Sequence, residues 1–186
     1  MLGNDLLKRH IARMSITPSV VRGNKGMVGC ADFAREYLSE KLDLSRFVVK
    51  TEKDFLDVLE NETAKFIQET KEKSNQAFIL SWGLARKILN IYLRDIVYCR
   101  YFVSYKINAA HLEIPLDSIV FKKIKEFYRE NSIRLPTCSV VKKEAPTIKA
   151  LTKDISDQYQ LVAKECAKTK DTYRIHLDAL WWGART

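Results

Sequence analysis

Apolar residues recur every three or four positions along most of this chain, which is the spacing of a helix that buries one face. In one such stretch, residues 82–103, the apolar side chains share one side of a helical wheel. They are Ala85, Leu89, Tyr92, Ile96, Cys99 and Val103. This stripe predicts a buried helix at the centre of the protein.

Further helices are predicted from the same spacing. They cover residues 4–14, 30–42, 117–131, 146–168 and 173–182, together with a helix that Thr51 caps and that ends in the polar run 69–76. The alternation typical of strands is scarce. Only residues 133–143 would suit a short β hairpin, and a loop is the favoured interpretation there. The sequence therefore predicts an all-α protein of six or seven helices around residues 82–103.

The length of 186 residues suits one domain, and a hydrophobic share of 46% is enough for a packed core. No run of about 18 uncharged apolar residues occurs, so no membrane-spanning helix is expected. The first ten residues include Asp5, Lys8, Arg9 and His10 and lack the apolar centre of a secretory signal. These features predict a single helical domain over residues 1–186, located in the cytoplasm and without a membrane partner.

The formal net charge of +9 is concentrated in the middle of the chain. Residues 77–150 hold thirteen Lys and Arg against six Asp and Glu, whereas residues 51–76 hold four against seven. A basic surface attracts polyanions, of which nucleic acid is the commonest. The charge predicts a nucleic acid, DNA or RNA, as partner, and an acidic protein is the alternative.

The helix over residues 82–103 also carries polar groups opposite its apolar stripe. Arg86, Asn90 and Arg94 are spaced four apart, and Tyr101 lies on the same side. The guanidinium group of arginine forms paired hydrogen bonds with phosphates, and aromatic rings stack on bases, so this face suits a nucleic acid. The competing interpretations are a solvated face without a ligand, or pairing inside the protein with Asp95 and Glu113.

Two further sets of basic residues are candidates for backbone contacts. Arg22 and Lys25 lie in a glycine-rich loop just before a helix, where backbone amides can hold a phosphate, although the loop lacks the ending of a P-loop. Lys122, Lys125 and Arg129 share one side of the helix over residues 117–131. They are expected to form part of one basic surface.

Carboxylates provide only weak signals for catalysis. Glu113 and Asp117 lie close together in sequence, and Asp178 follows near the end of the chain. Asp117 is better explained as a helix cap. No metal-ligand spacing, cofactor motif or nucleophile motif occurs, so no metal or cofactor is expected.

These features together predict a helical accessory or defence-type protein that binds nucleic acid through its phosphate backbone. The first alternative is an interaction subunit that docks on an acidic protein partner. The second is an enzyme that acts on a phosphate-bearing substrate with Glu113, Asp117 and Arg86 or Asp178.

The four cysteines, Cys30, Cys99, Cys138 and Cys166, are separated by 69, 39 and 28 residues. No pair has the close spacing of a zinc or redox motif, which predicts reduced core thiols. Thiol titration in denaturant without a reductant should find four free thiols per chain. A count of two would instead indicate a disulfide and an oxidising compartment.

Overall fold

The computed structural model describes residues 4–21, 28–73, 78–99, 105–131 and 138–183. This part of the chain is all-α and contains no strand. Its helices are α1 (Asn4–Ser15), α2 (Cys30–Glu36), α3 (Glu52–Lys73), α4 (Trp82–Tyr98), α5 (Ser118–Asn131), α6 (Ser139–Lys142), α7 (Lys153–Lys168) and α8 (His176–Gly183). A π-helical turn, Tyr37–Lys41, continues α2, and short 3-10 turns cover Leu44–Phe47, Ala109–His111 and Ile148–Ala150.

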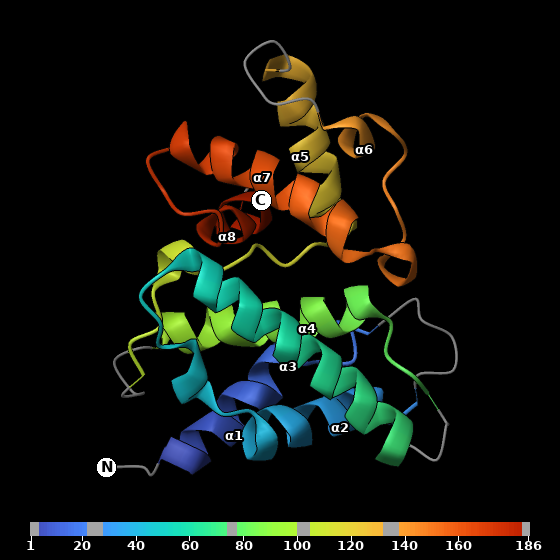
Figure 1. The fold of residues 1–186 in the computed structure, drawn as a ribbon, viewed down its shortest axis with the longest axis vertical. Coiled ribbons are helices and arrows are strands. Elements are labelled where there is room, and N and C mark those ends of the chain that lie inside the picture. The colour runs from blue at the N-terminus through green and yellow to red at the C-terminus, as the bar shows by residue number, and fades with distance from the viewer. Residues whose placement is uncertain (1–3, 22–27, 74–77, 100–104, 132–137, 184–186) are drawn as a thin grey trace.

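The helices gather into two groups, each around its own apolar cluster. Helices α1 to α4 form the lower group in Figure 1, and α5 to α8 form the upper group. Residues such as Phe55, Phe66 and Leu89 fill the first cluster, whereas Phe121 and Tyr159 belong to the second. An extended segment, yellow in Figure 1, passes between the two groups. The apolar stripes of residues 82–103 and 146–168 therefore face two clusters rather than one common core.

Helix α4 is buried around most of its circumference rather than along one stripe. Ser81 caps its start, because the hydroxyl accepts a hydrogen bond from the N–H of Leu84. Eleven of its seventeen residues are buried, and these include the polar residues Arg86 and Asn90. Of the predicted stripe, Ala85, Leu89, Tyr92 and Ile96 are buried, Cys99 is half-buried, and Val103 lies outside the described residues.

Three local predictions need correction. The helix expected from residue 146 begins at Lys153, because Thr152 caps it by accepting the N–H of Ile155. The last helix begins at His176 rather than at residue 173. Within the region considered for a β hairpin, Ser139–Lys142 is helical, and residues 132–137 lie outside the described residues.

Two predicted caps are confirmed. The carboxylate of Asp117 accepts the N–H groups of Ile119 and Val120 at 2.9 Å, at the start of α5. The hydroxyl of Thr51 accepts the N–H of Asp54 at 3.1 Å, at the start of α3. Among the described residues no helix is both long and apolar enough to cross a membrane.

The two groups meet closely at Gly83 in the first turn of α4. A Cβ atom there would lie 2.2 Å from the carbonyl oxygen of Ile148 and 2.7 Å from Cβ of Leu151. Such distances require the backbone to shift, so any larger side chain would push α4 away from the turn before α7. Glycine is therefore the residue that fits this crossing.

We expect Gly83→Ala to lower the free energy of unfolding by about 1 to 3 kcal/mol, the usual cost of overpacking. Urea denaturation followed by circular dichroism measures this change. The sign of the change in unfolding free energy is the critical result. Alanine at an uncrowded helix position stabilises a protein by about 0.5 to 1 kcal/mol relative to glycine. A stabilised variant would show that the crossing is looser than described.

Candidate functional site

A layer of polar side chains lies between the two apolar clusters, and we call it the polar seam. It consists of Glu60, Thr63, Arg86, Asn90, Glu113, Gln160 and Arg174. The extended segment that follows the turn Ala109–His111 runs through this layer with its residues buried. Both helix groups contribute side chains to the seam, so it joins them.

Glu113 is the charged centre of the seam and is only 1% exposed. Arg86 binds it with two hydrogen bonds, Nε to Oε2 at 2.8 Å and Nη2 to Oε1 at 3.1 Å. Asn90, one helical turn further along α4, donates to Oε2 at 3.0 Å. Such paired bonds from a guanidinium are among the strongest that a carboxylate forms.

The Nη1 group of Arg86 is also bonded within the protein. Its Nη1 atom donates to Glu60 and to the hydroxyl of Thr63, both at 3.2 Å on α3. The guanidinium carbon lies 5.3 Å from the ring centre of Trp82, in a cation–π contact. Arg86 thus holds α3, α4 and the extended segment together.

The electrostatic balance at Glu113 favours its charged form. Burial by itself raises the pKa of the carboxyl group, because the anion loses its hydration. Arg86, Arg174 and the hydrogen bond from Asn90 act against burial, and the net effect is a pKa below the ordinary value of 4.5. Glu113 is therefore charged at neutral pH and cannot act as an acid there, and its burial and its bonds to Arg86 and Asn90 enclose it within the protein.

The backbone of the extended segment is satisfied by side chains from the second group. Arg174 donates to the carbonyl oxygens of Leu112 at 2.7 Å and His111 at 3.0 Å. The amide of Gln160 on α7 accepts the N–H of Ile114 at 3.0 Å and donates to its carbonyl at 2.8 Å. Buried backbone groups need such partners, so these two side chains fix the path of the segment.

The contact face predicted on α4 is corrected by this arrangement. Arg86 and Asn90 are each 3% exposed and are bonded to Glu113, as the alternative of internal pairing required. Arg94 is half-buried and bonded to Asp95 and Asp178. Arg86 and Asn90 therefore organise the interior and do not form a contact surface. Tyr101 lies outside the described residues.

The basic residues predicted on α5 do come together at the surface. Lys122, Lys125 and Arg129 line one groove of about 590 Å³ between α5 and α6. Lys122 and Arg129 are exposed, and Lys125 donates to the carbonyl oxygen of Lys143. The other lining residues are Ser118, Glu126, Tyr128, Val141 and Ala145. We call this feature the basic groove. Arg22 and Lys25, the remaining predicted residues, lie outside the described part of the chain.

The carboxylates considered for catalysis are separated by the structure. Asp117 and Asp178 line a second hollow of about 620 Å³, together with Lys87. Glu113 and Arg86 do not line it, because they are enclosed in the polar seam. Sequence analysis missed Lys87, and no local signal marks it, since α1, α4 and α8 converge on this hollow only through the tertiary fold. Among the described residues no group of three His, Cys, Asp or Glu side chains could hold a metal ion.

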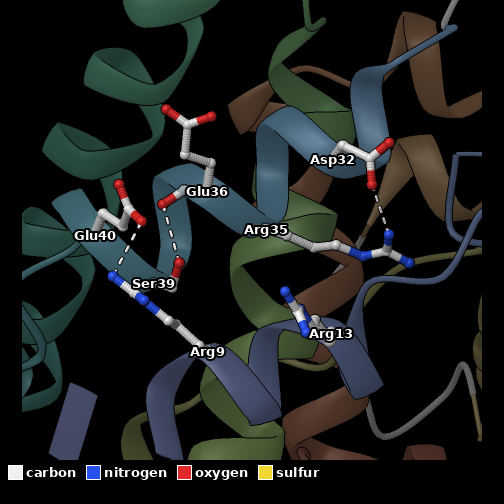
Figure 2. Close-up of a pocket in the computed structure, with 7 residues that line it drawn as sticks. All are labelled: Arg9, Arg13, Asp32, Arg35, Glu36, Ser39 and Glu40. Atoms are coloured by element: carbon white, nitrogen blue, oxygen red, sulfur yellow. Dashed lines mark hydrogen bonds and ion pairs between the residues drawn. The ribbon is translucent and has the colours of Figure 1, made fainter. Parts of the chain in front are cut away.

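A third hollow, of about 580 Å³, lies between α1 and the helix that begins with α2. Figure 2 shows its charged side chains from both elements. Arg35 pairs with Asp32 at 2.7 Å and Arg9 with Glu40 at 3.4 Å. The full lining is Arg9, Arg13, Asp32, Arg35, Glu36, Ser39 and Glu40. Three acidic residues balance the three arginines, so this surface is less attractive to a polyanion than the basic groove.

Comparison with protein-family models, with curated proteins and with solved structures finds no match to this chain.

Replacing Arg86 with Met should leave the Glu113 carboxylate buried without its main partner. We expect the free energy of unfolding at neutral pH to fall by about 3 to 5 kcal/mol, as measured by urea denaturation. The double variant Arg86→Met, Glu113→Leu removes both charges and should recover most of this loss. An equal deficit in the single and double variants would mean that the ion pair does not cause the effect.

The ion pair between Arg86 and Glu113 also makes the loss of stability in Arg86→Met depend on pH. In the wild type the lowered pKa of Glu113 contributes stability above the ordinary value of 4.5, and this stability is lost as the pH falls through the folded-state pKa. In the variant the carboxyl group stays buried without Arg86, which raises its pKa, so the stability difference between the wild type and Arg86→Met should narrow progressively as the pH falls from neutral. Arg129→Met, which removes an exposed arginine, is the matched control and should show no such narrowing.

Proposed function

We propose that this protein binds nucleic acid through the basic groove, by contacts to the phosphate backbone. The observation that carries the proposal is the convergence of Lys122, Lys125 and Arg129 on one groove between α5 and α6. Glu126 is the one acidic residue in the described lining, and Lys123 already neutralises it at 3.1 Å. The groove therefore carries an excess of positive charge.

The spacing of these cations suits a chain of phosphates. Lys122 and Arg129 are two helical turns apart, about 10 Å along the helix axis. Neither side chain forms an ion pair with another described residue, so both are free to bind an external anion. The charge of this segment supports the proposal, because residues 77–150 hold the largest excess of positive charge in the chain.

The groove offers little for reading bases. Tyr128 is 4% exposed and its hydroxyl accepts the N–H of Cys138, so its ring is not a platform for stacking. Phosphate contacts position a nucleic acid without reading its sequence. The proposed activity is therefore binding that does not depend on the base sequence. Release of counterions from the nucleic acid drives such binding.

An acidic protein partner is the second candidate, and the apolar part of the groove favours it. Val141 and Ala145 line the groove beside the cations. An acidic amphipathic helix would place apolar residues against these side chains and carboxylates against Lys122 and Arg129. A nucleic acid backbone gains less from that apolar wall.

The test is binding to a labelled duplex and a labelled single strand at several salt concentrations. Removing two phosphate contacts with Lys122→Ala, Arg129→Ala should weaken binding to every sequence alike and reduce the slope of log affinity against log salt by about two. The thermal melting temperature should change little, because exposed charges contribute little to stability. Fluorescence anisotropy measures the affinities.

The matched control is Lys53→Ala, Lys71→Ala, which removes the same charge from two exposed positions on α3. It should keep most of the affinity and the salt slope of the wild type. If the wild type binds neither probe at about 50 mM salt, where non-specific affinity is strongest, the nucleic-acid proposal fails. Binding of an acidic amphipathic peptide under the same conditions would then favour the second candidate.

A further inference from the structure

A cleft of about 620 Å³ lies where α1, α4 and α8 meet at the edge of the polar seam. We call it the seam cleft and define it by Lys87, Arg94, Asp95, Tyr98, Asp117 and Asp178. Its volume is in the range of small-molecule sites. It is separate from the basic groove, since the two share no lining residue.

The charges of the cleft are organised around Arg94. Its Nε atom donates to Asp95 at 2.7 Å and its Nη1 atom donates to Asp178. Asp95 uses its other oxygen to accept the hydroxyl of Ser15 at 2.6 Å. Asp178 keeps its Oδ1 atom, and Asp117 its Oδ2 atom, without a hydrogen bond from any described residue. Two carboxylate oxygens therefore remain available to a ligand that donates hydrogen bonds.

Lys87 supplies the complementary donor. Its ammonium group donates to the carbonyl oxygen of Val20 at 3.2 Å, which occupies one of its three hydrogens. Burial lowers the pKa of Lys87, while Asp117 and Asp178 act in the opposite direction. Burial also raises the pKa of Asp178, against the effect of Arg94. These groups are poorly hydrated, so a ligand that bonds to them loses little to competing water.

An aromatic surface completes the cleft. Tyr98 lines it and is 41% exposed. The ring is stacked on His176 with ring centres 5.6 Å apart and planes 13° apart, and the two side chains share a hydrogen bond of 3.2 Å. A fixed, half-exposed tyrosine ring suits stacking of a planar group.

We propose that the seam cleft binds a neutral nucleoside, with its base on Tyr98 and its sugar hydroxyls between Lys87 and the carboxylates of Asp117 and Asp178. Hydroxyl groups both donate to carboxylates and accept from an ammonium group, which matches the free atoms of the cleft. Three carboxylates face two cations here, so the cleft favours a neutral ligand over a phosphorylated one. This proposal does not depend on the function of the basic groove.

The experiment is isothermal titration of the wild-type protein with the four ribonucleosides, deoxyadenosine and adenosine monophosphate. Adenosine should bind at one site, and deoxyadenosine more weakly because it lacks one of the hydroxyl groups. The monophosphate should also bind more weakly than adenosine, since it adds negative charge. Absence of binding by all four ribonucleosides at about 1 mM would overturn the proposal, because this excludes even millimolar affinity. Tighter binding of the monophosphate than of adenosine would equally overturn it.

Two tyrosine variants locate the site. Tyr98→Ala should weaken adenosine binding about tenfold or more, through loss of the stacking surface. Tyr173→Ala is the matched control, because Tyr173 is 51% exposed and also contacts His176 but does not line the cleft. An equal loss of adenosine affinity in the two variants would contradict the placement of the base on Tyr98. Circular dichroism melts establish that both variants are folded, and Lys87→Met provides a second test from a lining residue about three turns away on the same helix.

Discussion

The carboxylate of Glu113 is the constraint on which the arrangement of the helices depends. An anion that is 1% exposed is tolerated only when fixed cations and donors replace its hydration. Arg86 and Asn90 meet this requirement, and their spacing of four residues directs both toward the same carboxylate from one face of α4. The position of α4 relative to the extended segment is set by this pair. The positions of α3 and α7 follow through Arg86 and Gln160.

The polar seam gives specificity where apolar packing alone would give little. Apolar surfaces accept many relative positions at similar free energy, whereas hydrogen bonds and ion pairs accept few. A buried ion pair contributes little net stability compared with an apolar pair of the same shape. Arg174 and Gln160 nevertheless satisfy buried backbone groups of the extended segment that would otherwise lack these partners. The apolar clusters thus supply most of the stability, and the seam selects one arrangement of them.

Sequence patterns predicted the helices better than they predicted the site. Periodicity located the buried side of α4, and the cap at Asp117 located the start of α5, because both signals are local. Arg86 and Asn90 were assigned to a surface because the apolar stripe implied a polar outer face. Their partner Glu113 lies 27 and 23 residues away, and only the tertiary fold brings it to them. Local spacing did group Lys122, Lys125 and Arg129 along one groove, because this grouping depends on a single helix.

The two surfaces considered for ligands depend on the fold in different ways. The basic groove is formed by α5, α6 and the segment after α6, all within the second helix group. The seam cleft takes residues from both groups, with Lys87 on α4 and Asp178 on α8. A ligand in the cleft would therefore stabilise the contact between the groups, because it binds only when they are in place. A ligand in the basic groove has no such requirement, so disruption of the seam would affect the cleft more than the groove.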